Sequence, residues 1–385
     1  MQLDTIDWSA LLRLALVGLA LAAGPLIWLV WRQRKAQPLG RLQGLTVLTL
    51  FLTFDLVLFG AFTRLTDSGL GCPDWPGCYG HASPVGAQAD IALAQASAPD
   101  GPVTHGKAWI EMVHRYLASS VGLLILVLAV SAWVLARRKL GERLINPWWA
   151  TVTLVWVCLQ GAFGAWTVTM KLFPAIVSLH LLGGYVLLAL LAVQAVRQSQ
   201  MLRAQAPLPV SGALRLATLA AIGVLLLQVL SGAWVSTNYA VLACAEFPSC
   251  QGSWWPAMDF AEGFSLWRPL GLAADGTPLS FQALTAIHFS HRLLAVVAVV
   301  VLGMLAWRLR RLPALAMPVR CLSGLLVLQV ATGLSNVVLG WPILAAVLHT
   351  GGAGAIGVCL VWILAATHQH VRRGTVPLRA EKAFK

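Results

Sequence analysis

Five histidines lie inside the apolar segments of this chain, where an ionisable side chain is costly and is therefore a candidate for function. They are His114, His180, His288, His291 and His349. Four of them form pairs across an internal repeat, since His114 corresponds to His291 and His180 to His349. A single intramembrane histidine often only hydrogen-bonds a neighbouring helix. Four histidines at matching positions of two copies favour metal ligation.

The surroundings of these histidines favour haem over zinc. No cluster of Asp, Glu or Cys lies at the same depth to complete a zinc shell. Two imidazoles on facing helices of an apolar bundle suit six-coordinate haem iron, whose porphyrin supplies the other four nitrogens. Small residues near two of the histidines would let a flat macrocycle approach the backbone: Gly183, Gly184, Gly351 and Gly352.

Arg115 and Arg292 directly follow His114 and His291. An arginine at membrane depth needs a carboxylate, and a haem propionate would accept two parallel hydrogen bonds from it. We therefore expect both arginines to contact bound haem. The alternative is that their side chains extend to lipid headgroups.

The two copies differ at one ionisable position, three residues before the second-helix histidine. The first copy has Glu111 there and the second has His288. A carboxylate beside a haem could act in proton transfer or stabilise positive charge that develops on substrate carbon. His288 carries no negative charge and would instead bond a propionate or tune a redox potential. The alternative is that Glu111 only pairs with Arg115, four residues further on.

Two cysteines lie in the segment GLGCPDWPGCYG (69–80), and two more occupy the matching segment of the second copy. Four cysteines allow three pairings. The repeat favours one disulfide within each segment, Cys72–Cys78 and Cys244–Cys250. A zinc site is disfavoured because His81 is the only further ligand nearby. A structural disulfide that shapes a lid and a redox-active pair both remain possible roles.

The segments that carry these residues must span a membrane. The 385-residue chain is 58% hydrophobic and 11% charged, with a mean hydropathy of +0.77. A span needs about 20 apolar residues. Continuous runs of that length, without the alternation of a β-barrel, predict helices near 9–31, 43–63, 109–136, 148–169, 174–196, 213–235, 284–307, 318–340 and 344–366. No cleavable signal peptide is evident at 1–8.

Basic residues predict the orientation. They follow the first, third, fifth, seventh and ninth spans, whereas the long loops at 64–107 and 237–283 hold few. Because cytoplasmic loops carry the excess of Lys and Arg, we expect the N-terminus and the cysteine segments outside and the C-terminus in the cytoplasm. The basic tail then reports topology, and no nucleic-acid partner is expected despite the net charge of +13.

An internal duplication organises the chain. GAFTRLTDSGLGCPDWPGCYG (60–80) aligns with GAWVSTNYAVLACAEFPSCQG (232–252), EMVHRYLA with HFSHRLLA, LQGAFGAWTV with LQVATGLSNV, and LHLLGG with LHTGGA, all in the same order. We therefore expect an all-α polytopic membrane protein of two tandem four-helix bundles plus one extra N-terminal helix. The expected divisions are 1–40 (extra helix), 41–200 (first half), 201–370 (second half) and 371–385 (tail). Because the spans per half are even in number, the halves should be related by an axis along the membrane normal.

These motifs together resemble the haem A synthase family. GAFTRLTDSGLGCPDWPGCYG, EMVHR, SLHLLGG, IHFSHR and VLHTGG carry the resemblance, which covers about residues 43–366. It implies two four-helix halves that oxidise the C8 methyl of haem O to a formyl group, by successive hydroxylations, to give haem A for terminal oxidases. Both cysteine pairs are present, as in the cysteine-bearing branch of the family.

The resemblance also implies roles for particular residues. His114 and His180 would ligate the iron of the haem O substrate, with Glu111 as the catalytic carboxylate of the first half, while His291 and His349 would ligate a haem b cofactor in the second. Arg115, Arg292 and His288 would contact the haems. A bacterial inner-membrane location, lipid contacts, a second copy of the chain, and haem O synthase or oxidase assembly partners follow as expectations. A di-haem b electron-transfer protein of the quinone oxidoreductase type is the alternative; it explains the histidines but not Glu111 in one half alone.

Overall fold

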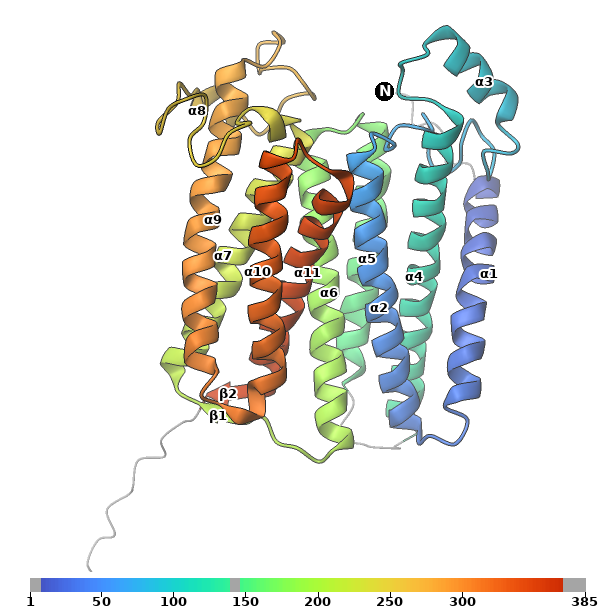
Figure 1. The fold of residues 1–385 in the computed structure, drawn as a ribbon. Coiled ribbons are helices and arrows are strands. Elements are labelled where there is room, and N and C mark those ends of the chain that lie inside the picture. The colour runs from blue at the N-terminus through green and yellow to red at the C-terminus, as the bar shows by residue number, and fades with distance from the viewer. Residues whose placement is uncertain (1–7, 139–145, 370–385) are drawn as a thin grey trace, which may run out of the picture.

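The computed structural model describes residues 8–138 and 146–369, which form an almost entirely helical bundle (Figure 1). Within these residues, nine helices are long and apolar enough to cross a membrane. They are α1 (Trp8–Arg32), α2 (Pro38–Leu65), α4 (His105–Arg137), α5 (Pro147–Thr169), α6 (Pro174–Leu202), α7 (Gly212–Thr237), α9 (Phe281–Leu309), α10 (Ala316–Val338) and α11 (Ile343–Ala366). The prediction of an all-α multi-pass membrane protein is confirmed.

Local sequence signals explain where several helices begin. Proline occupies the first turn of α2, α5 and α6, where its missing N–H costs no hydrogen bond. Side-chain caps start three others: the hydroxyls of Thr104, Ser211 and Ser280 accept from the backbone amide three residues further on, at the N-termini of α4, α7 and α9. Each predicted span is recovered to within a few residues, except that α6 continues to Leu202.

Each half is a ring of four helices. In the first half α2 contacts α4 and α6, and α5 contacts the same two helices. In the second half α7 contacts α9 and α11, and α10 contacts the same two. Therefore α4 and α6 stand at opposite corners of the first ring, and α9 and α11 at opposite corners of the second. The duplicated sequence has folded into duplicated architecture.

The halves meet through α2, α6, α7 and α11, and the contacts are symmetric: α6 packs on α11, while α2 packs on α11 as α7 packs on α6. At the end of the bundle, Nη2 of Arg64 donates to the carbonyl of Ser236 (2.5 Å), and the Tyr239 hydroxyl donates to Oδ1 of Asp67 (2.6 Å). Ser236 and Tyr239 are the repeat counterparts of Arg64 and Asp67. Contacts between counterparts place these residues beside the pseudo-symmetry axis.

The two long loops lie at the same end of the bundle (Figure 1). The first contains the helix α3 (Gln88–Ser97), and the second contains the 3₁₀ turn η1 (Ala240–Leu242) and the short helix α8 (Phe260–Gly263). At the opposite end, β1 (Leu208–Val210) pairs in parallel with β2 (Thr367–Gln369), joining the start of the second half to its end.

Helix α1 stands outside both rings and packs mainly on α4. Gly18 permits the close approach, because a Cβ at this position would lie 2.7 Å from Cβ of Ser119. The predicted basic tail at 371–385 and the basic residues Lys139 and Arg143 lie outside the described residues.

Candidate functional site

The four paired histidines lie on diagonal helices of each ring. His114 on α4 lies near His180 on α6. His291 on α9 and His349 on α11 repeat the arrangement. All four side chains are partly exposed, although they lie within apolar helices. Each half therefore brings a histidine of its second helix near a histidine of its fourth helix, and their ligation of a metal stays a prediction.

Each of these imidazoles lies against a glycine of a neighbouring helix. A Cβ at Gly60 would stand 3.0 Å from Cε1 of His114, and one at Gly232 would stand 2.9 Å from Cε1 of His291. The fourth-helix histidines make the corresponding contacts. A Cβ at Gly164 would stand 3.5 Å from Cε1 of His180, and one at Gly333 would stand 2.9 Å from Cε1 of His349. A side chain at Gly60, Gly232 or Gly333 would push the ring away, so these three glycines set the ring positions, whereas a Cβ at Gly164 would be in ordinary van der Waals contact with His180.

The ring nitrogens are available for ligation. Within the described residues, Nε2 of His114, His180 and His349 has no hydrogen-bond partner, and Nδ1 of His114 and His180 is buried without one. No group of three or more His, Cys, Asp or Glu side chains in the described part of the chain could hold a metal ion. Two nitrogen ligands per half are too few for a zinc site and are the number that a haem iron takes from the protein. The residues present thus fit a haem in each half.

Glu111 is buried and fully engaged by the first loop. It is 3% exposed; its Oε2 accepts from the backbone amide of Cys72 (2.7 Å), and its Oε1 pairs with Nη2 of Arg115. Nη1 of Arg115 donates to loop carbonyls, including those of Asp74 (3.0 Å) and Gly77 (2.5 Å). The ion pair that the spacing predicted is present, and it is part of a larger contact between helix α4 and the loop.

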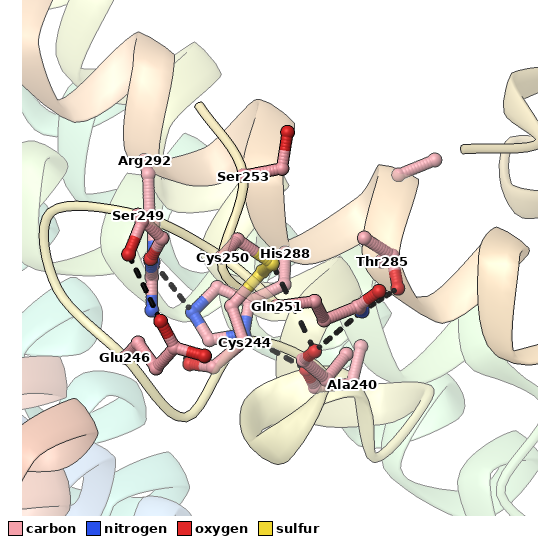
Figure 2. Close-up of a disulfide and its surroundings, with 12 residues drawn as sticks. Ala240, Cys244, Glu246, Ser249, Cys250, Gln251, Ser253, Thr285, His288 and Arg292 are labelled. Atoms are coloured by element: carbon pink, nitrogen blue, oxygen red, sulfur yellow. Dashed lines mark hydrogen bonds between the residues drawn. A yellow bond between two sulfur atoms is a disulfide. The ribbon is translucent and has the colours of Figure 1, made fainter. Parts of the chain in front are cut away.

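His288 takes the place of Glu111 in the second half (Figure 2). Its Nδ1 donates to the carbonyl of Ala240 (3.0 Å), and its Nε2 accepts from Nε of Arg292 (3.2 Å). Arg292 in turn donates to the carbonyls of Ser249 (3.1 Å) and Cys244 (2.6 Å). The second half therefore attaches its loop to the helix without a carboxylate.

Both arginines thus bind loop carbonyls, and neither extends to lipid headgroups, which was the alternative role. Asp74 and Glu246, at matching positions of the repeat, each accept from a backbone amide of the turn that follows, Gly80 at 2.7 Å and Gly252 at 3.1 Å. The contact of the arginines with haem propionates stays a prediction.

The cysteines pair within each loop, as the repeat favoured. Cys72 bonds to Cys78 and Cys244 to Cys250, and all four side chains are fully buried. In Figure 2 the second disulfide lies beside His288 and Arg292. Each disulfide therefore closes a short turn directly over the end of the helix that carries the second-helix histidine.

The expectation that glycines near His180 and His349 leave room for a haem macrocycle is wrong. Gly183 and Gly352 do not leave room for a macrocycle, because the side chains of Gln160 and Gln329 occupy that space, and Gly351 accommodates Leu58 in the same way. A Cβ at Gly184 would meet Val57 at 3.5 Å. These glycines serve helix packing, in which small residues let helices approach closely.

Sequence reasoning missed the polar residues that contact the Nδ1 atoms of the histidine rings. Ser231 and Gln228 contact Nδ1 of His291 (2.8 and 3.1 Å), and Thr332 contacts Nδ1 of His349 (3.1 Å). Phenylalanines occupy two of the corresponding positions in the first half, Phe59 and Phe163. Comparing the two aligned copies for polar residues present in one copy only would have found them.

Comparisons with known proteins agree with this geometry. A family model described as "Cytochrome oxidase assembly protein" (COX15-CtaA) matches residues 43–361. The chain is 39% identical over 319 residues to a protein of Shewanella oneidensis named "Heme A synthase", covering 82% of this chain and 93% of the relative. Proteins of the same name from Caulobacter vibrioides (31% over 339 residues, 81% and 92% covered) and Mesorhizobium japonicum (30% over 373 residues, 91% and 96% covered) are also similar.

Proposed function

This chain belongs to the COX15-CtaA family and is a haem A synthase, and we propose that its two halves divide the work between a substrate site and a cofactor site. The observation that carries the division is the asymmetry at one matched position. Both halves hold a histidine pair on diagonal helices, but only the first has a carboxylate, Glu111, next to that pair. The first half would bind haem O and the second a haem b.

The reaction adds oxygen to one methyl carbon of the substrate and removes electrons from it. In the net reaction, R–CH₃ and H₂O give R–CHO, four protons and four electrons. The steps are two hydroxylations and the loss of one water from the resulting gem-diol. The protein must therefore hold the substrate, receive protons and give electrons a way out. Haem b in the second half would supply that electron route when bound.

The first half would hold and activate the substrate. His114 and His180 would ligate its iron, because their free Nε2 atoms lie across the bundle from each other on α4 and α6. Glu111 would lie beside the reacting edge, one helical turn outward from His114 on the same face. Its carboxylate would receive protons or stabilise positive charge at the methyl carbon. The loop closed by Cys72–Cys78 would exclude water from it.

The second half would bind its haem between His291 and His349, with His288 in place of the carboxylate. Without a carboxylate at this position, the half has no negative charge there to stabilise positive charge at a methyl carbon, which suits a cofactor site. Arg115 and Arg292 would reach propionates only through a change in their loop contacts, so we assign them first to holding the loops.

The membrane setting follows from the helices. Nine apolar helices in the described residues make this a multi-pass membrane protein. We place it in the bacterial inner membrane, with both cysteine loops outside and the C-terminus in the cytoplasm, because basic residues gather at the opposite ends of the spans. Haem O synthase, oxidase assembly factors and a second copy of the chain are the proposed partners.

Pigment analysis tests the assignment. The chain would be expressed with a source of haem O, purified, and its pigments extracted and separated. We expect haem A from the wild type, no haem A but retained haem b from His114→Ala and His180→Ala, and loss of haem b from His291→Ala and His349→Ala. His105→Ala, on the same helix as His114 but with no side-chain hydrogen bond to any described residue, is the matched control. Only haem b from the wild type would contradict the function and favour the electron-transfer alternative.

A further inference from the structure

The histidine pairs of the two halves differ in the hydrogen-bond partners of their Nδ1 atoms. We propose that this difference makes the second half retain its haem while the first half exchanges it. Ser231 and Thr332 would be the positioning residues of the retaining site. The inference rests on the proposed function, since it concerns the same two sites, and it adds which residues make one of them permanent.

The hydroxyl of Ser231 holds His291 in one tautomer. Ser231 donates its own proton to the carbonyl of Gln228 (2.9 Å), so its oxygen is left to accept. Nδ1 of His291 lies 2.8 Å from that oxygen. The proton of the imidazole therefore sits on Nδ1, and the lone pair of Nε2 is free for a metal.

Thr332 does the same for His349. Its hydroxyl donates to the carbonyl of Leu328 (2.9 Å), four residues earlier on α10. Its oxygen then accepts from Nδ1 of His349, 3.1 Å away. Both ligands of the second half thus have the same arrangement, although Ser231 and Thr332 come from different helices, α7 and α10.

Gln228 also contacts His291: its Nε2 donates to the carbonyl oxygen of His291 (3.4 Å), and only with its amide turned over would Gln228 offer a second acceptor for the Nδ1 proton. Its Nε2 lies 3.1 Å from Nδ1 of His291, while its Oε1 is buried without a partner. An Nδ1 that bears a proton cannot accept from Nε2. A rotation of the amide by 180° exchanges the positions of Nε2 and Oε1, and Oε1 would then accept a hydrogen bond from Nδ1–H of His291.

The first half lacks every one of these acceptors. The counterparts of Ser231, Thr332 and Gln228 are Phe59, Phe163 and Leu56. Phe59 stacks on His114 with ring centroids 6.3 Å apart, and Nδ1 of both His114 and His180 is buried without a partner. Nothing in the described residues therefore fixes which nitrogen of these two rings carries the proton.

The physical consequence is a difference in haem retention. A hydrogen bond from Nδ1 fixes ring orientation and makes Nε2 a stronger donor, and loss of such a partner typically lowers metal affinity by about 10- to 100-fold. A cofactor site gains from this retention. A substrate site must release haem A after each turnover, so weaker ligation by His114 and His180 suits it.

The test measures haem loss, with the chemical identity of each haem reporting its site. Purified full-length protein is mixed with excess apomyoglobin as haem acceptor, and the haem left on the protein is extracted over time. We expect haem O and haem A to leave the wild type faster than haem b. Thr332→Val and Ser231→Ala should each speed the loss of haem b by about tenfold or more, and should raise its reduction potential, since a weaker donor stabilises ferric iron less.

Matched variants keep the result interpretable. Thr332→Ser retains the hydroxyl and should keep haem b as the wild type does. Ser335→Ala, one turn further along α10, removes a hydroxyl whose hydrogen bond within the described residues goes to the carbonyl of Thr332, and it should change nothing. Phe163→Thr places a hydroxyl behind His180 and should slow the loss of haem A.

Three results would overturn the proposal. Haem b could leave the wild type as fast as haem A, Thr332→Val could retain haem b as the wild type does, or Thr332→Ser could lose haem b as fast as Thr332→Val. These results are separate from the proposed function. If haem A forms but Thr332→Val retains haem b, only the retention mechanism fails. If the wild type forms no haem A, the function fails whatever the rates.

Discussion

The backbone amide of Cys72 donates a hydrogen bond to Oε2 of Glu111 over 2.7 Å. The cysteine loop and the proposed catalytic carboxylate are therefore one structural unit, joined further by Arg115, which binds both. A change in the loop should alter the position of the carboxylate, and a substitution of the carboxylate should alter the structure of the loop. The second half links its loop to the helix without a carboxylate, because His288 donates to the carbonyl of Ala240 in that loop.

Glu111→Gln separates charge from hydrogen bonding. The amide oxygen of Gln can still accept from Cys72, so the loop and both haems should stay in place. The negative charge is lost, so conversion of haem O to haem A should fall by two orders of magnitude or more, which is about the effect of removing a general acid–base group. The measurement is the ratio of haem A to haem O in extracted pigments. Normal haem A with this variant would remove Glu111 from the chemistry.

The two disulfides provide a matched comparison. Cys72→Ala with Cys78→Ala should lower the occupancy of substrate haem, because the lid over the first site is released, and should lower haem A formation with it, while haem b is retained. Cys244→Ala with Cys250→Ala should lower haem b occupancy instead. Each pair closes a short loop, so each should cost about 2 kcal/mol of stability. If the first pair left substrate haem bound but unconverted at full occupancy, a redox role would replace the lid role.

Gly333→Ala tests whether glycine sets the position of His349. A Cβ at Gly333 would stand 2.9 Å from Cε1 of the ring, so the ring must move and haem b occupancy should drop. Gly324→Ala on the same helix is the control, because a Cβ there meets nothing within 4 Å. The absorbance of bound haem b per protein measures both. Equal occupancy in the two variants would refute the role of Gly333.

Tyr239→Phe tests the contact between the halves. Burial, opposed by Arg64, raises the pKa of Tyr239, so its hydroxyl stays protonated and donates to Asp67. The variant should lose about 1 kcal/mol of stability. Since the folded-state pKa is the higher one, the contribution of Tyr239 is complete below about pH 10 and is lost as the pH rises through the raised value. Melting temperatures of wild type and variant between pH 8 and 11 should therefore converge.

The control for that comparison is Tyr79→Phe, because the Tyr79 hydroxyl makes no hydrogen bond in the described residues. Its melting temperature should follow the wild type near neutral pH. A Tyr239→Phe variant as stable as Tyr79→Phe would show that the contact between the halves contributes nothing.

Much of the fold could be predicted because each signal was local or repeated. Apolar runs of membrane-spanning length predicted the helices, and the recurrence of Cys72 and Cys78 as Cys244 and Cys250 predicted both halves and both disulfides. The His114–His180 and His291–His349 pairs followed from the same alignment. Duplication supplied a second copy against which each position could be compared.

The contacts of individual side chains could not be predicted in this way. The sequence indicated that Arg115 and Arg292 could contact haem propionates, but it did not indicate the loop carbonyls that accept hydrogen bonds from both side chains. Gly183 and Gly352 were expected to leave open space, but whether a glycine faces a cavity or a glutamine depends on the rotation of the neighbouring helix. Such facts belong to tertiary packing, which spacing along one helix does not contain.

The pairing of Leu208 with Thr367 has a consequence for how this chain could be cut and rejoined. The second half starts and finishes on adjacent strands, so its two ends already lie side by side. A unit with neighbouring ends can be inserted, permuted or fused behind another copy without stretching a connection. The small sheet therefore lies at a point where one four-helix unit could be joined to its duplicate by gene fusion.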